Sequence, residues 1–138
     1  SPMDFRNYGM IAWAYLLTKD AKYRDAVALS LDFVLGMNPT EMSWITGAGS
    51  VSPMDPLSYN CLHDGIVEPY PGILLFGPME SIHWLWLTPL TFHPKVETLG
   101  FFSRFQDVYD DVPMSEYVVD RQHISIIMAG AILMESEK

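Results

Sequence analysis

The sequence predicts an all-α fold in which three helices carry a long irregular region. Apolar residues recur at helical spacing over residues 4–18, 20–35 and 115–136. Nine of the ten prolines and seven of the nine glycines fall within residues 36–113, where no long segment keeps one period. A loop of that length does not suit a small self-contained domain. We therefore expect loops on a larger helical scaffold, with a compact three-helix domain as the alternative.

The first two helices are expected to form an antiparallel hairpin. The second has the cleaner pattern, with apolar residues at helical spacing at Tyr23, Val27, Leu31 and Val34. Asp20 is placed to cap its start, and Gly36 followed by Asn38-Pro39 is placed to end it. The short link at Lys19 and Asp20 brings the two helices side by side.

The predicted third helix begins near Ser115 and ends near Ser136. Its second half, residues 124–134, is apolar nearly all round, so this helix needs neighbours on several sides. Two partner helices do not easily supply them, which again favours a larger scaffold. A short helix is also expected at residues 99–105.

The charge and the cysteine count exclude several classes of function. The 138 residues carry a formal charge of −9 and no basic stripe. This argues against nucleic acid as a partner, because phosphate binding needs clustered Lys and Arg. A neutral ligand suits the chain better. Cys61 is the only cysteine, so no intrachain disulfide is possible.

Other sequence signals for membranes, metals and cofactors are missing. The longest apolar run, residues 126–134, is too short to span a membrane, and the first residues do not resemble a signal peptide. No two histidines lie one helical turn apart, and no nucleotide-binding loop is present. We therefore expect no membrane partner, no metal and no cofactor.

Short motifs in the irregular region occur in a fixed order. They are Gly36-Met37-Asn38-Pro39, Ser43-Trp44-Ile45-Thr46-Gly47-Ala48-Gly49, Asp64-Gly65-Ile66, Pro69-Tyr70-Pro71-Gly72 and Gly77-Pro78. In this order they resemble the late part of the catalytic module of glycoside hydrolase family 9, the cellulase family, whose fold is an (α/α)6 barrel. The resemblance implies that residues 1–138 are the C-terminal portion of such a domain. It would contain a helical hairpin at 4–35, cleft loops at 36–113 and a final helix at 115–136.

The chain departs from the family at one cleft motif. In the family, a Pro-x-x-Pro segment is followed by His-His-Arg, whose side chains help to bind and orient the sugar. Here Pro53-Met54-Asp55-Pro56 is followed by Leu57-Ser58-Tyr59. The spacing is kept, but the Leu57 side chain forms no hydrogen bonds and the bidentate contacts of an Arg are lost. The chemistry of the cleft is therefore altered or lost.

The resemblance implies two catalytic carboxylates, of which this chain contains at most one. An inverting glycosidase uses one carboxylic acid to protonate the leaving oxygen and one carboxylate to activate water. The family takes its base from an Asp pair near the start of the module, which these residues do not include. Counting forward from Asp110-Asp111 makes Glu116 the candidate general acid, whereas counting back from Ala129-Gly130 places Gln122 there. The chain alone is therefore not expected to be an active enzyme.

Four residues are candidates for substrate binding, namely Trp44, Tyr59, His63 and Asp64. Flat aromatic rings suit the apolar faces of sugars, although packing beneath the loops is the alternative for each ring. The irregular region contains further rings at Tyr70, Trp84 and Trp86.

Several polar residues have more than one interpretation. His63 is placed to form an acid–base pair with Asp64, as are His83 and His93 with nearby acids. His123 is expected in the core. Asp110-Asp111 is expected in a solvated turn or at a cation.

The sequence thus predicts a carbohydrate-active protein. The resemblance implies part of a glycoside hydrolase that cleaves β-linked glucan or a related glycan by an inverting acid–base mechanism. A non-catalytic carbohydrate-binding relative of the same fold is the alternative. The expected partners are a β-glucan or related oligosaccharide, and either the N-terminal part of the barrel or another copy of the chain. By resemblance alone, we expect a secreted or periplasmic location.

Overall fold

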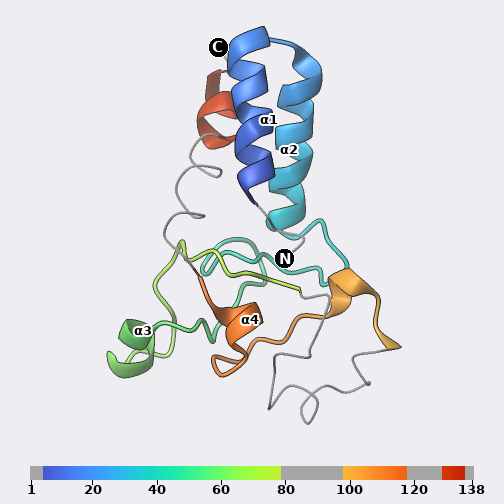
Figure 1. Ribbon diagram of the computed structural model, residues 1–138. Coiled ribbons are helices and arrows are strands. Elements are labelled where there is room, and N and C mark those ends of the chain that lie inside the picture. Colours follow the sequence, from blue (N-terminus) through green and yellow to red (C-terminus); the bar gives the residue numbers. More distant parts are fainter. Residues whose placement is uncertain (1–4, 79–97, 118–128, 136–138) are drawn as a thin grey trace.

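The computed structural model describes residues 5–78, 98–117 and 129–135 (Figure 1). Helix α1 (Phe5–Thr18) and helix α2 (Ala21–Val34) lie side by side and form the predicted hairpin. Lys19 turns the chain between them with a positive φ of 56°. The Asp20 carboxylate caps α2 as predicted, because it accepts a hydrogen bond from the Lys22 N–H at 3.0 Å.

Residues 129–135 are helical and lie beside the hairpin (Figure 1). The buried side chains that join the three helices are Ala12, Val27, Ala129 and Ile132, with Ile11, Tyr15 and Leu16 packed around them. In the described part of the predicted apolar stretch, Ala129 and Ile132 therefore pack on the hairpin.

The predicted start of the last helix at Ser115 is wrong. Helix α4 (Val112–Ser115) is a separate short helix, and Glu116 and Tyr117 leave it in non-helical conformation. Glu116 has φ −69° and ψ 154°, because its carbonyl accepts a hydrogen bond from the Phe76 N–H at 3.0 Å instead of continuing a helix. Residues 118–128 lie outside the described part of the chain.

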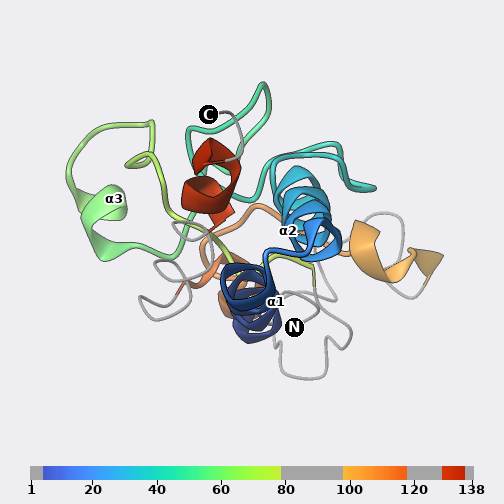
Figure 2. The ribbon, with the colours of Figure 1, turned by 90° about the horizontal axis from the view of Figure 1, so that it is seen from above.

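The region between α2 and α4 contains more local structure than its composition indicates. It includes α3 (Tyr59–His63) and the 3-10 helix η3 (Phe101–Ser103), which is a shortened form of the helix predicted at residues 99–105. Helix α3 and η3 lie on opposite sides of this region, as Figure 1 and Figure 2 both show. An isolated antiparallel bridge joins Ile45 to Leu74.

The two residues of the bridge pack with Trp44 in a hydrophobic core, in which the Trp44 side chain is completely buried. The Trp44 N–H donates to the Val34 carbonyl, and the Trp44 carbonyl accepts from the Leu75 N–H, both at 3.0 Å. The Phe33 ring meets the Trp44 ring edge-on with 5.2 Å between their centroids. Trp44 therefore joins the end of α2 to a chain segment about thirty residues further on.

The turn after α2 is closed by the side chain of Asn38. Its amide group donates to the carbonyls of Phe33 at 2.7 Å and Met42 at 2.9 Å, and its oxygen accepts from the Thr40 N–H at 3.0 Å. Gly36 before it has φ 125°, which residues with a Cβ rarely adopt. The predicted stop signal thus ends the helix and sends the chain towards Trp44.

The hairpin leaves large apolar side chains exposed. Met10, Trp13 and Leu17 follow one another at helical spacing on α1 and are 71%, 55% and 80% exposed. Leu29 on α2 is 69% exposed. A row of large exposed apolar side chains is unusual on the surface of a monomeric protein.

Candidate functional site

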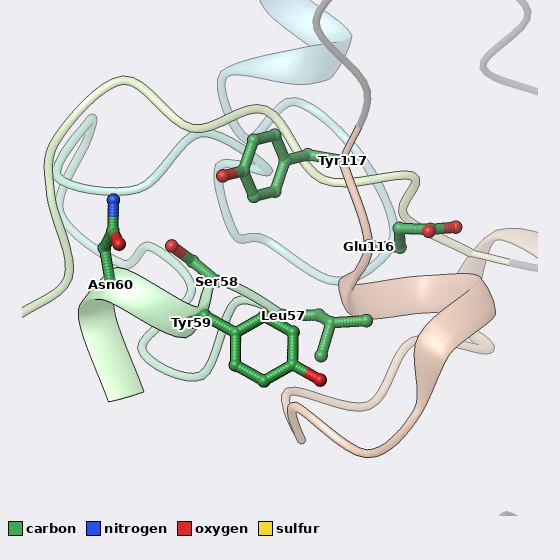
Figure 3. Close-up of a pocket in the computed structure, with 6 residues that line it drawn as sticks. All are labelled: Leu57, Ser58, Tyr59, Asn60, Glu116 and Tyr117. Carbon is green, nitrogen blue, oxygen red and sulfur yellow. The ribbon is translucent and has the colours of Figure 1, made fainter. Parts of the chain in front are cut away.

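An open pocket of about 380 Å³ lies where α3 begins beside the end of α4 (Figure 3). Its lining residues come from two segments and are Leu57, Ser58, Tyr59, Asn60, Glu116 and Tyr117. The first segment includes the three residues that replace the His-His-Arg motif of the resembled family. The structure therefore brings this altered motif and the candidate acid to one pocket.

The first wall of the pocket follows the segment Pro53–Pro56, in which both prolines are buried. Ser58 precedes α3 and is 5% exposed, whereas Tyr59 at the first position of α3 is 77% exposed. One turn later on the same helix, the His63 ring stacks on Tyr59 with 6.3 Å between centroids and an angle of 23°. Two of the predicted binding residues thus form an exposed aromatic pair.

The second wall is the chain that leaves α4. Glu116 is the C-cap of this helix, so the prediction that it begins a long helix is wrong. Its position is fixed through the backbone, because its N–H donates to the Val112 carbonyl and its carbonyl accepts from the Phe76 N–H. In Figure 3 the side chains of Glu116 and Tyr117 point in opposite directions, with the carboxylate directed away from Ser58.

Asp64 follows α3 and does not line the pocket. Its carboxylate accepts a hydrogen bond from the Ile66 N–H at 2.8 Å. The negative charge of Asp64, together with a hydrogen bond to it, raises the pKa of the exposed Tyr70 hydroxyl. The described contacts of Asp64 are therefore with Ile66 and Tyr70, whereas His63 contacts Tyr59.

Trp44 was predicted as a residue that binds sugar, and the structure corrects this. The side chain is 0% exposed and packs against Phe33 and the other residues of the loop core. Gly77 faces the ring, since a Cβ at this glycine would lie 3.4 Å from Trp44 Cδ2. Neither face of the ring is therefore open to a ligand.

Within the described segments, no group of three or more His, Cys, Asp and Glu side chains is arranged to hold a metal ion. Asp111 is 4% exposed and precedes α4, so it does not belong to a solvated turn, while Asp110 is exposed. None of the described helices is long and apolar enough to cross a membrane. The remaining candidates lie outside the described residues, namely His83, Trp84, Trp86, His93, Gln122 and His123.

Four pocket residues were not among the binding candidates predicted from the sequence, namely Leu57, Ser58, Asn60 and Tyr117. Ser58 and Asn60 flank the predicted Tyr59, and Tyr117 follows the predicted Glu116. Their positions beside the predicted residues were the available signal. Their convergence depends on contacts between segments far apart in the sequence.

Solved structures with the same arrangement of helices and loops define the class of protein. The chain superposes on a Bacteroides ovatus family 9 glycoside hydrolase with a TM-score of 0.74 and 22% identity, over 93% of this chain and 20% of that one. A metagenome-derived family 9 endoglucanase gives a TM-score of 0.67 and 26% identity, over 90% and 21% of the respective chains. The fold is therefore part of the (α/α)6 barrel of these glycoside hydrolases, and within the described residues no strand is formed.

The sequence profile of glycosyl hydrolase family 9 matches residues 5–126. The chain therefore belongs to glycoside hydrolase family 9, as the order of its motifs indicated.

Curated relatives from three bacteria share segments of the chain. A cellodextrinase of Butyrivibrio fibrisolvens is 31% identical over 84 residues, which is 60% of this chain and 15% of the relative. A xyloglucan-specific endo-beta-1,4-glucanase of Bacteroides ovatus is 35% identical over 68 residues, or 49% and 12% of the two chains. Endoglucanase C of Cellulomonas fimi is 35% identical over 75 residues, or 52% and 7%. The aligned segments thus span between 7% and 15% of the relatives' length.

Proposed function

We propose that the 138 residues are the C-terminal portion of a family 9 catalytic domain, with cleft loops at 36–113 between a helical hairpin and the last helix. The exposed row of Met10, Trp13 and Leu17 on α1 supports this, because further barrel helices would bury it. The small share of each relative that the chain matches supports it as well. The same row argues against the compact three-helix alternative.

We further propose that the chain supplies one wall of a sugar cleft in a hydrolase that acts on β-linked glucan. The pocket lining supports this function, since it combines aromatic rings, hydroxyl groups, one amide and one carboxylate. These groups match a pyranose, which has apolar faces and hydroxyl edges. The cellodextrinase and the endo-beta-1,4-glucanase among the relatives favour β-1,4-glucan as the substrate class.

In this proposal Glu116 is the candidate general acid and the remainder of the barrel supplies the base. Glu116 is the only carboxylate among the lining residues of the pocket in the described part of the chain. It would protonate the leaving oxygen while the base activates water on the opposite face of the sugar, which inverts the anomeric centre.

The Glu116→Gln variant of the complete protein tests this role. The variant keeps the size of the side chain and removes its acidic proton. We expect kcat on a soluble β-glucan to fall by about 100-fold or more, because a general acid contributes roughly 10²–10⁴-fold. Glu41→Gln is the matched control, because Glu41 is exposed and does not line the pocket. Unchanged kcat in a folded Glu116→Gln variant would exclude Glu116 as the acid.

A non-catalytic carbohydrate-binding protein is the second candidate function. It is favoured by Leu57-Ser58-Tyr59 in place of His-His-Arg and by the direction of the Glu116 carboxylate in Figure 3. Both candidates predict that Tyr59→Ala weakens oligosaccharide binding, since a stacked ring contributes about 1 kcal/mol. Binding of cellotetraose by the complete parent protein without any cleavage would select this second function.

A further inference from the structure

The pocket wall formed by Leu57, Ser58 and Tyr59 follows a segment without secondary structure. Pro53 and Pro56 have no N–H, so the only backbone donors of Pro53–Pro56 are those of Met54 and Asp55. Both donate to one side chain from a distant part of the chain. The Asp107 carboxylate accepts from the Met54 N–H at 2.6 Å through Oδ2 and from the Asp55 N–H at 3.1 Å through Oδ1.

The next backbone donor is bound by the same distant segment. The Leu57 N–H donates to the Ser115 carbonyl at 2.9 Å. Ser115 is completely buried, and its hydroxyl donates to the carbonyls of Asp111 at 2.8 Å and Tyr109 at 3.0 Å. The backbone N–H groups of Met54, Asp55 and Leu57 therefore all donate to acceptors within residues 107–115. This segment directly precedes Glu116.

The segment that carries Asp107 is itself anchored to the hairpin. Phe102 in η3 meets Phe33 of α2 edge-on, with 5.2 Å between ring centroids. The Arg104 side chain donates to the Leu99 carbonyl at 3.0 Å and so joins the two ends of η3. Asp107 thus connects the wall to a fixed part of the fold.

We propose that Asp107 is a positioning residue that fixes the pocket wall at Leu57–Tyr59 relative to Glu116 and so sets the affinity for the sugar. The proposal rests on the proposed function for its ligand. Asp107 does not line the pocket, so it acts through the Pro53–Pro56 backbone and not on the sugar. A carboxylate suits this role because both of its oxygens accept, whereas an amide offers one acceptor and places an N–H₂ group against the other donor.

Asp107→Asn in the complete protein tests the proposal, with Asp110→Asn as the control, since Asp110 lies in the same segment and is exposed. Cys61 in α3, the only cysteine of this chain, reports on the wall through its rate of modification by a maleimide, located by peptide mapping. We expect Asp107→Asn to raise this rate and the Kd for cellotetraose about fivefold each, because one of the two hydrogen bonds to a charged group is lost and the acceptor of the other loses its charge. Asp110→Asn is expected to change neither.

The proposal is overturned if a folded Asp107→Asn protein shows an unchanged rate of Cys61 modification or an unchanged Kd for cellotetraose. Should that variant not fold, amide hydrogen exchange in the parent decides instead. The Met54 and Asp55 amides are expected to exchange at least about tenfold more slowly than the Val67 amide, whose residue is 81% exposed. Exchange at the Val67 rate overturns the proposal. If the parent binds no glucan, the proposed function fails, while the Cys61 rate and the amide exchange still test the contact of Asp107 with the wall.

Discussion

The helical hairpin and the loop region are stabilised in different ways. The hairpin has regular secondary structure, yet Met10 and Leu17 on α1 are 71% and 80% exposed. The described part of the loop region has short helices and an isolated bridge, yet Trp44, Thr46 and Leu75 are 0%, 0% and 1% exposed. Regular secondary structure and deep burial of large side chains therefore do not coincide in this chain. The loops form a core together with the end of α2, and the exposed face of α1 is where we propose that further helices pack.

The largest expected effect comes from replacing a tryptophan by alanine in each of the two regions. Trp44→Ala should lower the free energy of unfolding by about 3–5 kcal/mol, because it leaves a cavity in the loop core. Trp13→Ala in the same 138-residue chain should cost less than about 1 kcal/mol, because the Trp13 side chain is 55% exposed. Denaturant unfolding of both variants measures the difference. Equal costs would contradict a loop core that is better packed than the exposed face of α1.

A second comparison uses two threonines with the same hydrogen-bonding pattern. The Thr46 hydroxyl donates to the Tyr70 carbonyl at 2.6 Å and accepts from the Ile73 N–H at 2.9 Å, in the buried core. The Thr18 hydroxyl donates to the Ala14 carbonyl at 2.7 Å and accepts from the Asp20 N–H at 3.2 Å, on the surface.

Replacing each threonine by valine keeps the shape and removes the hydroxyl. Thr46→Val should cost about 1–3 kcal/mol, because buried backbone groups are left without a partner. Thr18→Val should cost a few tenths of a kcal/mol, since water replaces the lost partner. The shift in thermal unfolding temperature of each variant checks this order. A larger shift for Thr18→Val would contradict the expectation that the buried hydrogen bonds of Thr46 contribute more to stability than the exposed ones of Thr18.

The smallest expected effect concerns the charge of Asp55. Burial, and then the negative charge of Asp107, raise the pKa of the Asp55 carboxyl above its usual value of 3.8. The folded state therefore disfavours ionised Asp55, and this penalty is present at neutral pH and is lost as the pH falls through the raised pKa towards 3.8. Asp55→Asn should raise the stability at pH 7 by a few tenths of a kcal/mol, because the group is largely exposed.

Unfolding of Asp55→Asn and its parent at pH 7 and pH 3 measures this penalty. The gain in stability should be present at pH 7 and absent at pH 3, where the carboxyl is protonated in both states. A gain of equal size at both values would show that removal of the charge is not its cause.

Part of the candidate site followed from the sequence because its signals are local. The altered motif at Leu57-Ser58-Tyr59 and the candidate Glu116 were identified by their place in an ordered series of motifs, and both line one pocket. Trp44 was assigned the wrong role, because the sequence does not distinguish a loop tryptophan whose ring contacts a sugar from one whose ring packs in a core. Asp107 gave no signal, since its partners are backbone groups more than fifty residues away.

The sequence by itself determined the hairpin, its cap at Asp20, the stop after α2 and the family. Each depends on residues a few positions apart, for which helical period and turn chemistry are sufficient. Only the tertiary structure decided that Trp44 is buried, that α4 ends at Ser115 and that Asp107 holds the wall of the pocket. These features arise from hydrogen bonds and packing between distant segments, which a local pattern does not specify.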